Sequence, residues 1–283
     1  RVQQAVVPAP PTDKIAQAAE LISRAKNPIV MAGNGVVRGR ACKQLIQFAE
    51  SLNIPVATTF MAKGAMPFSH DLSLGTVGLQ AHDYVACGFD RADVIICVGF
   101  DMVEYHPQAW HPSKDKKIIH IDQHYAEVDE HYILEVGVVG DIAKALDGIA
   151  DKAHRRVNNN NGELRRLIVD ELTAMENDES FPMKPQRILC DVRKALGDED
   201  ILISDVGAHK MWIARHYHCH EPNTCLIPNG FCSMGFALPG AISASLVYPE
   251  RRILSICGDG GFLMNVQEME TARRLNCNMT VMV

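Results

Sequence analysis

The sequence lacks several features that define whole classes of proteins. Its 283 residues contain no apolar stretch approaching the roughly 20 residues that a membrane-spanning helix needs, and no basic-then-apolar signal pattern at the start. The formal net charge is −6, with acidic and basic residues mixed throughout, so no basic stripe exists that could follow a phosphate backbone. We therefore expect a partner that is neither a membrane nor a nucleic acid.

The chain also lacks the cysteine spacing of a disulfide or zinc framework. It has nine cysteines, none of them in a Cys-x-x-Cys pair, and most lie inside apolar runs. This pattern is typical of buried thiols in a reducing compartment, and the expected location is the cytoplasm.

Both ends of the sequence are expected to be cuts within a longer chain. Residues 1–12 are rich in proline and small residues, there is no initiator Met, and residues 278–283 (NMTVMV) form an apolar strand pattern with nothing after it. We expect an internal segment of a longer protein, in which residues 1–12 are a linker from a preceding domain. A chain of this length accommodates two domains.

Helix and strand patterns alternate through the first half. The apolar periodicity predicts helices at 13–26, 37–53 and 141–154, with Thr12 as the first N-cap, and strands at 28–33, 55–58, 94–99 and 117–122. Such alternation favours a parallel sheet covered on both faces. We assign residues 13–155 to one nucleotide-binding-like domain.

The second half repeats this alternation after an asparagine-rich run at 154–163, which is not expected to hold regular structure. Residues 156–185 are predicted to be a linker region containing a helix near 164–175. Residues 186–283 form the second domain, with helices at 186–196, 208–218 and 235–247 and strands at 201–204, 224–227 and 253–257. The predicted fold class is α/β: two doubly wound parallel-sheet domains, the second truncated at its C-terminal end.

The strand at 253–257 runs directly into Gly258, Asp259, Gly260 and Gly261, followed by a helix pattern. Glycines let the backbone approach a ligand closely, a helix N-terminus offers free N–H groups to phosphate, and a carboxylate suits Mg²⁺. Open parallel sheets bind ligands at this edge. These four residues alone are equally compatible with an ordinary strand-to-helix turn that uses Asp as a cap.

Two upstream segments extend the pattern: 204–212 (SDVGAHKMW) and 229–239 (NGFCSMGFALP). Together with Gly-Asp-Gly-Gly, in this order, they resemble the thiamine diphosphate-dependent enzymes. The resemblance implies a diphosphate-binding domain in which Asp259 ligates Mg²⁺ and Met234 is an apolar wedge beneath the bent cofactor. The other implied cofactor-binding residues are Gly207, Ala208, His209, Cys232, Gly258, Gly260 and Gly261.

The resemblance also implies what this segment does not contain. In the family a second metal ligand, an Asn, ends the signature, and here it is expected just beyond Val283. The activating Glu belongs to a separate pyrimidine-binding domain, so no catalytic residue is assigned in this segment, and the segment alone is expected to be inactive.

The first domain offers a weaker motif, Gly33-Asn34-Gly35 after a strand. The third glycine of a dinucleotide fingerprint is replaced by Arg38, so a structural turn is the preferred interpretation. Residues 99–112 (GFDMVEYHPQAWHP) lack the arginines of the FAD-binding acetolactate synthases. Their Tyr105-x-Pro107-x-x-Trp110 pattern resembles the FAD-independent, catabolic-type enzymes, so we expect no FAD.

The family resemblance thus implies a thiamine diphosphate- and Mg²⁺-dependent acetolactate synthase that condenses two pyruvates into 2-acetolactate and CO₂. A homodimer or tetramer is expected, because in the family the cofactor lies between domains of different subunits. Two alternatives remain open: another thiamine-dependent 2-oxo acid decarboxylase or carboligase, and a non-catalytic nucleotide-binding protein.

Overall fold

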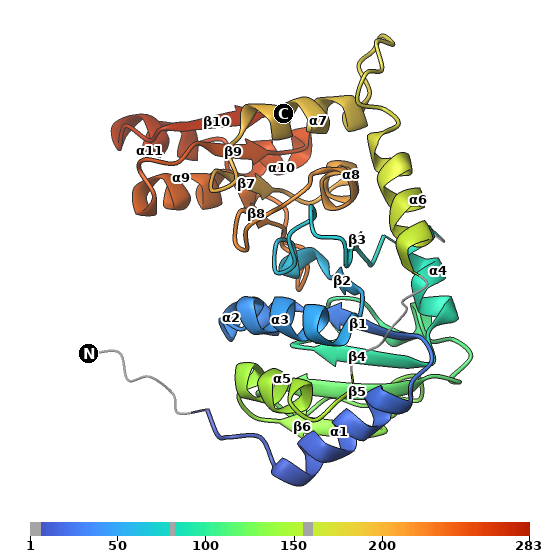
Figure 1. Cartoon of the computed structure of the whole chain (residues 1–283). Coiled ribbons are helices and arrows are strands. Elements are labelled where there is room, and N and C mark those ends of the chain that lie inside the picture. Colours follow the sequence, from blue (N-terminus) through green and yellow to red (C-terminus); the bar gives the residue numbers. More distant parts are fainter. Residues whose placement is uncertain (1–6, 80–82, 155–160) are drawn as a thin grey trace. The chain divides into compact units, whose positions relative to one another are not determined.

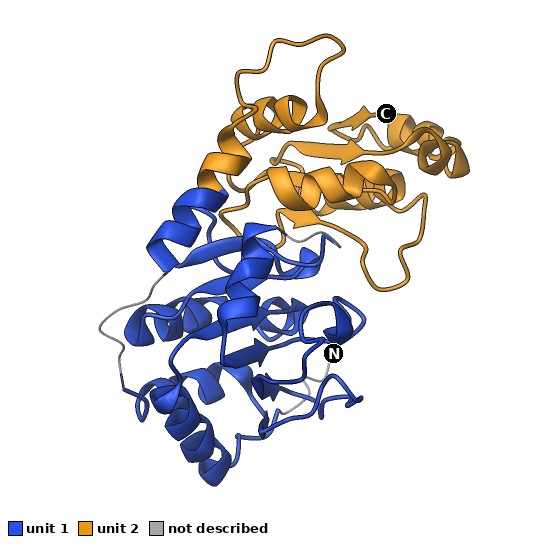
Figure 2. Ribbon diagram, turned by 90° about the vertical axis from the view of Figure 1, so that its right-hand side faces the viewer, with its two compact units in different colours: residues 1–168 blue, residues 169–283 orange. Residues whose placement is uncertain are grey.

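The structure is a computed structural model that describes residues 7–79, 83–154 and 161–283. It divides into two compact units, residues 1–168 and residues 169–283, coloured separately in Figure 2. Each unit is built on its own parallel sheet, so the α/β architecture expected from the sequence is confirmed. Within the described part of the chain, no helix combines the length and the apolar character needed to cross a membrane.

Six parallel strands form the sheet of unit 1 in the order β3-β2-β1-β4-β5-β6 (Figure 1). The order reverses between β1 and β4, which pair directly from Pro28–Val94 to Ala32–Val98. The strands are β1 (Pro28–Ala32), β2 (Val56–Thr58), β3 (Ser73–Thr76), β4 (Val94–Val98), β5 (Lys117–Asp122) and β6 (Val136–Val139).

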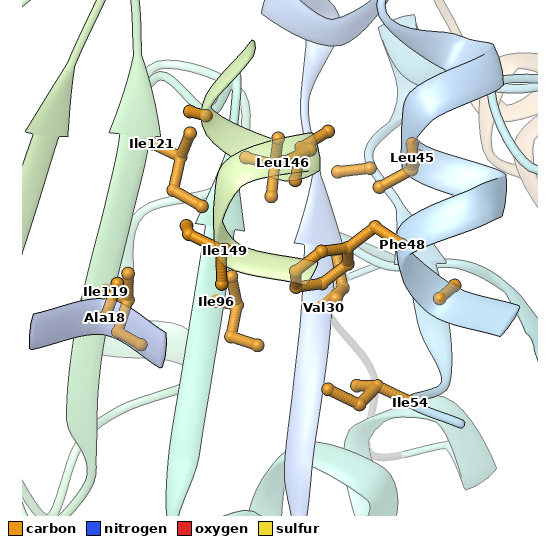
Figure 3. Packing of buried hydrophobic residues seen from close by; sticks show 14 of the residues in the cluster. Ala18, Val30, Leu45, Phe48, Ile54, Ile96, Ile119, Ile121, Leu146 and Ile149 are labelled. Atoms are coloured by element: carbon orange, nitrogen blue, oxygen red, sulfur yellow. The ribbon is translucent and has the colours of Figure 1, made fainter. Parts of the chain in front are cut away.

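Helices cover both faces of this sheet. One face carries α1 (Thr12–Arg24), α3 (Cys42–Leu52) and α5 (Ile142–Ala150), whose apolar sides meet alternate residues of the strands in a single core (Figure 3). Phe48, Ile96 and Leu146 are almost completely buried there, and each such side chain contributes about 1.5–3 kcal/mol. On the other face, α4 (Tyr84–Arg91) brings Gly88 against Ile29 and against Leu164 of α6 (Asn161–Thr173).

Unit 2 has a four-stranded parallel sheet in the order β10-β9-β7-β8. Its strands are β7 (Ile201–Ser204), β8 (Cys225–Leu226), β9 (Ile253–Ile256) and β10 (Met279–Met282). Its helices are α7 (Pro185–Ala195), α8 (Ala208–His216), α9 (Ala237–Val247), α10 (Asp259–Met264) and α11 (Glu268–Arg274). Ala237 and Ala241 of α9 pack on Ile203 and Ile253 of the sheet. Here the strand order reverses between β7 and β9.

Every strand predicted from the sequence is present, with bounds that differ by no more than two residues. The sequence patterns missed β3, β6 and α4. Three local predictions are wrong. Thr12 is the first helical residue rather than the N-cap, which is Pro11 and makes no side-chain cap bond. The expected helix 37–53 is two helices, α2 (Asn34–Arg38) and α3, because Arg40 adopts a left-handed φ of 54°.

The third correction concerns the asparagine-rich run. Helix α6 begins at Asn161, so residues 161–163 are helical rather than irregular. Residues 155–160 of the same run lie outside the described residues.

Gly33, Gly35 and Gly99 form a close backbone crossing at the reversal point of unit 1. The N–H groups of Gly33 and Gly35 donate to the carbonyls of Val98 and Gly99, both at 2.8 Å. A Cβ on Gly33 would lie 2.4 Å from the Gly99 carbonyl oxygen, and a Cβ on Gly35 would lie 2.6 Å from the Gly99 Cα. Because both obstacles are backbone atoms, these glycines are needed for the packing of the turn after β1 against β4.

We predict that Gly33→Ala destabilises unit 1 by about 2–3 kcal/mol, since the added methyl must push two backbone segments apart. The matched control is Gly137→Ala on edge strand β6, where the added Cβ meets only a Leu134 side chain at 3.6 Å and the change should stay within about 1 kcal/mol. Urea unfolding followed by Trp110 fluorescence, in a Trp212→Phe background, measures both. Equal midpoints for the two variants would contradict the packing argument.

Candidate functional site

The residues expected to bind a cofactor lie at one edge of the unit 2 sheet. In a parallel sheet all strands end at the same edge, and a crevice opens where the strand order reverses. β7 runs into the N-terminus of α8 and β9 runs into the N-terminus of α10, and these two strands flank the reversal. The turns at 205–209 and 258–261 are therefore neighbours, although about 50 residues separate them along the chain.

Gly258 is the N-cap of α10, and Asp259 is the first helical residue. The Asp259 carboxylate is exposed, and its Oδ1 accepts a hydrogen bond from the Gly260 N–H at 2.8 Å. One oxygen is thus oriented by the backbone while the group remains open to solvent. Within the described residues no group of three or more His, Cys, Asp and Glu side chains is placed to hold a metal ion. A cation at Asp259 would therefore take most of its ligands from a bound phosphate and water, as Mg²⁺ commonly does.

His209 lies across both turns. Its Cε1 would be 2.9 Å from a Cβ on Gly207 and 3.4 Å from a Cβ on Gly258, so the absence of side chains at both glycines leaves space for the ring. Burial lowers the pKa of His209, which the nearby Asp205 partly opposes, so the imidazole is largely neutral near pH 7. The ring bonds the Asp205 backbone, whereas its buried Nε2 has no hydrogen-bond partner among the described residues.

The loop 229–235 completes this edge. Met234 is 44% exposed, and its Cε would contact a Cβ on Gly260 at 3.4 Å, so the proposed apolar wedge lies beside the glycine turn. Cys232 is exposed and has a left-handed φ of 50°. Ala208 is an exposed first residue of α8. All nine sequence-predicted residues therefore lie on the segments that border one edge of unit 2.

These features fit the diphosphate and metal end of thiamine diphosphate. Diphosphate oxygens need N–H donors, and the edge offers two helix N-termini and glycines without obstructing side chains. The exposed Asp259 supplies the hard oxygen ligand that Mg²⁺ prefers.

Sequence reasoning missed the residue that holds these segments together, Asp205. Its carboxylate is completely buried and accepts hydrogen bonds from the backbone N–H groups of Val206, Gly235 and Ala237 at 2.7, 2.9 and 3.1 Å. It also packs against Gly261, where a Cβ would lie 2.9 Å from Oδ1. One side chain thus joins all three segments of the site. Its sequence signals were its position at the carboxyl end of a strand and its place in the segment 204–212, although no role was assigned to it there.

We predict that Asp205→Asn destabilises unit 2 by about 1–3 kcal/mol, because the amide replaces one acceptor by a donor that faces an N–H group. Asp198→Asn, an exposed carboxylate in the same unit, is the control. Urea unfolding monitored through Trp212 on α8 measures the difference. Equal stability of the two variants would show that the three bonds to Asp205 do not hold the site.

Unit 1 has a second feature at its own reversal point, a cavity of about 400 Å³. It is lined by the turn after β1 and by the segments that follow β4 and β5. Among its described lining residues, the charged side chains are Arg38, Asp101, Glu104, Asp122 and Glu127. Asp101, Asp122 and Glu127 outnumber the single guanidinium even without Glu104, so the cavity has an acidic character, which disfavours a ligand with a diphosphate group.

Glu104 connects the walls of this cavity. It is 6% exposed and accepts hydrogen bonds from the Asn34 N–H at 3.0 Å and from the Thr59 hydroxyl at 2.5 Å. Burial raises the pKa of Glu104 to about 7, although these hydrogen bonds act in the opposite direction. The folded state therefore holds this proton more tightly than the unfolded state does, and the stability that Glu104 contributes falls as pH rises from about 4.5 to about 7.

Between pH 5 and pH 8 the ionisation of Glu104 should lower the free energy of unfolding of the wild type by about 2–3 kcal/mol. We predict that Glu104→Gln does not show this decrease. The variant should be closest to wild type at pH 5 and more stable at pH 8. Glu127→Gln, on an exposed carboxylate of the same cavity, is the control. Urea unfolding of unit 1 at both pH values tests this, and parallel pH profiles for wild type and Glu104→Gln would contradict it.

Comparisons with known proteins bear on both units. Residues 15–149 match the family model of the thiamine pyrophosphate enzyme central domain, and residues 205–283 match that of the C-terminal TPP binding domain. The chain is 33% identical over 274 residues to an acetolactate synthase of Bacillus subtilis, which covers 93% of this chain and 47% of the relative.

Two further relatives give the same result. An acetolactate synthase large subunit of Corynebacterium glutamicum is 33% identical over 275 residues, covering 94% of this chain and 44% of the relative. An acetolactate synthase of Mycobacterium leprae is 32% identical over 277 residues, covering 93% and 43%. The chain spans about half the length of these curated relatives.

Proposed function

The chain belongs to the thiamine pyrophosphate enzyme family, through its central and TPP-binding domains, and from that premise we propose that it is part of an acetolactate synthase. The reaction would condense two pyruvates into 2-acetolactate and CO₂. The relatives that carry this name align with more than nine-tenths of the chain, across both domains. The observation that carries cofactor use is the pair of helix N-termini after β7 and β9, with glycines at both turns and the exposed Asp259 beside them.

The residues of this chain would bind and orient the cofactor. Asp259 would ligate Mg²⁺, and the backbone at Gly260 and Gly261 would contact the diphosphate. Gly207, Ala208 and His209 would contact the diphosphate from the other turn. Because the neutral His209 ring gives its single N–H to the Asp205 backbone, its Nε2 would donate to the diphosphate only when the ring is protonated.

The remaining contacts concern the rings of the cofactor. The Cys232 backbone would bond the aminopyrimidine, and Met234 would support the bend between the rings with its thioether chain. Thiamine diphosphate, when bound, supplies the carbon nucleophile and the electron sink that 2-oxo acid chemistry requires. The protein's part in this region is orientation and charge neutralisation.

We propose that the enzyme does not use FAD. The charged side chains that line the cavity at the reversal point of unit 1 are mainly carboxyl groups, which would oppose the diphosphate of a dinucleotide. Trp110, the last residue of the Tyr105-x-Pro107-x-x-Trp110 pattern, is buried against Phe89, Phe100 and Tyr132. We further propose a cytoplasmic homo-oligomer; the nine free cysteines support a reducing compartment.

The full-length gene product, assayed with pyruvate, thiamine diphosphate and Mg²⁺, should form one 2-acetolactate and one CO₂ for every two pyruvates consumed. It should show no flavin absorbance and should not need added FAD. Release of CO₂ with acetaldehyde and no acetolactate would instead identify a decarboxylase. Failure to bind thiamine diphosphate would contradict the cofactor assignment itself.

Asp259→Asn should weaken Mg²⁺ binding in the presence of thiamine diphosphate by at least about tenfold, because the neutral amide is a poor ligand for a hard cation. Folding should be unaffected, since the Asp259 side chain is exposed and the amide oxygen can still accept from Gly260. Glu268→Gln at the start of α11 is the matched control. Calorimetric Mg²⁺ titrations measure the change, and unchanged affinity would remove Asp259 from the metal site.

A further inference from the structure

Lys210 is the third residue of α8, and only 7% of it is exposed. Its ammonium donates to Asn229 Oδ1 at 2.6 Å and lies 3.2 Å from the Sγ of Cys232. Both partners belong to the loop 229–235, about 20 residues further along the chain. A buried cation thus connects the turn after β7 to this loop.

The position of Lys210 is unfavourable by local criteria. The first turn of a helix carries the positive end of its dipole, which repels a cation, and burial of an ammonium is costly unless hydrogen bonds compensate it. Helix propensity and solubility therefore do not account for a lysine here. The polar contacts with the loop are the interactions that compensate its burial.

The loop is exposed to solvent from Gly230 to Cys232. Phe231 is completely exposed, and Cys232 adopts a left-handed backbone. The far end is held at Gly235, whose N–H donates to Asp205 and whose carbonyl accepts from Asn265 at 2.7 Å. Lys210 holds the near end.

We infer that Lys210 is a positioning residue that fixes the loop 229–232 in the conformation that receives the aminopyrimidine of the cofactor. This inference rests on the proposed function, which places the aminopyrimidine against the Cys232 backbone. Lys210 acts through Asn229 and the loop backbone. Its effect should therefore appear in cofactor affinity and in loop mobility.

The test uses the full-length enzyme and its Lys210→Met variant, which keeps the chain length and removes the ammonium. Calorimetry with saturating Mg²⁺ should show thiamine diphosphate bound about tenfold more weakly, the size expected for losing one charged hydrogen bond. The kinetic loss should be concentrated in the cofactor KM rather than in kcat. In cofactor-free protein, amide hydrogen exchange across residues 229–235 should be faster.

Asn229→Ala removes the same contact from the loop side and avoids changing a buried helix residue. If the two side chains act through one interaction, the double variant Lys210→Met/Asn229→Ala should bind the cofactor no more weakly than either single variant. Lys210→Arg, which keeps the charge and the donors, should restore part of the affinity. Lys194→Met, an exposed lysine of α7, is the matched control.

Unchanged affinity and unchanged exchange in both single variants would overturn the inference, and so would additive effects in the double variant. If the wild-type enzyme binds no thiamine diphosphate, the proposed function fails. Exchange in the loop would then still decide whether Lys210 tethers it.

Discussion

Both units depend on one constraint of parallel sheets: every strand ends at the same edge, and a crevice opens only where the strand order reverses. In unit 1 the reversal lies between β1 and β4, and in unit 2 between β7 and β9. The acidic cavity and the expected cofactor residues lie at these two places. The position of each follows from the order in which the strands pair, because pairing decides which turns become neighbours.

The two crevices differ in what surrounds them. In unit 1, Gly33, Gly35 and Gly99 let two backbone segments pack closely, and Glu104, whose pKa is raised by burial, links the walls of the cavity. In unit 2, the buried carboxylate of Asp205 accepts hydrogen bonds from three backbone N–H groups. The donors that remain at the edge of the sheet are the N–H groups at the starts of α8 and α10. The first crevice is acidic and the second is rich in donors, so a diphosphate is favoured only in the second.

Under the proposed function, cofactor binding by the second unit would depend on three separate segments being held in register. Asp205 joins them through backbone bonds, and Lys210 adds a side-chain link between the first segment and the loop that carries Cys232. Neither residue needs to touch the cofactor to matter. A displaced loop would lose the shared geometry that a bent, two-ring ligand requires, because such a ligand contacts several segments at once.

The sequence by itself determined the α/β class, the alternation of elements and the residues of the glycine-aspartate turn, because apolar periodicity and glycine placement are local properties. It did not reveal β3, a short strand whose Gly75 has a positive φ, or the helix break at Arg40, where the apolar pattern continues through a left-handed residue. The tertiary structure alone decided the roles of Asp205, Glu104 and Lys210. Each has partners that lie 19 to 70 residues away in the chain, and a hydrogen bond across such a distance exists only after the strands have paired and brought the turns together.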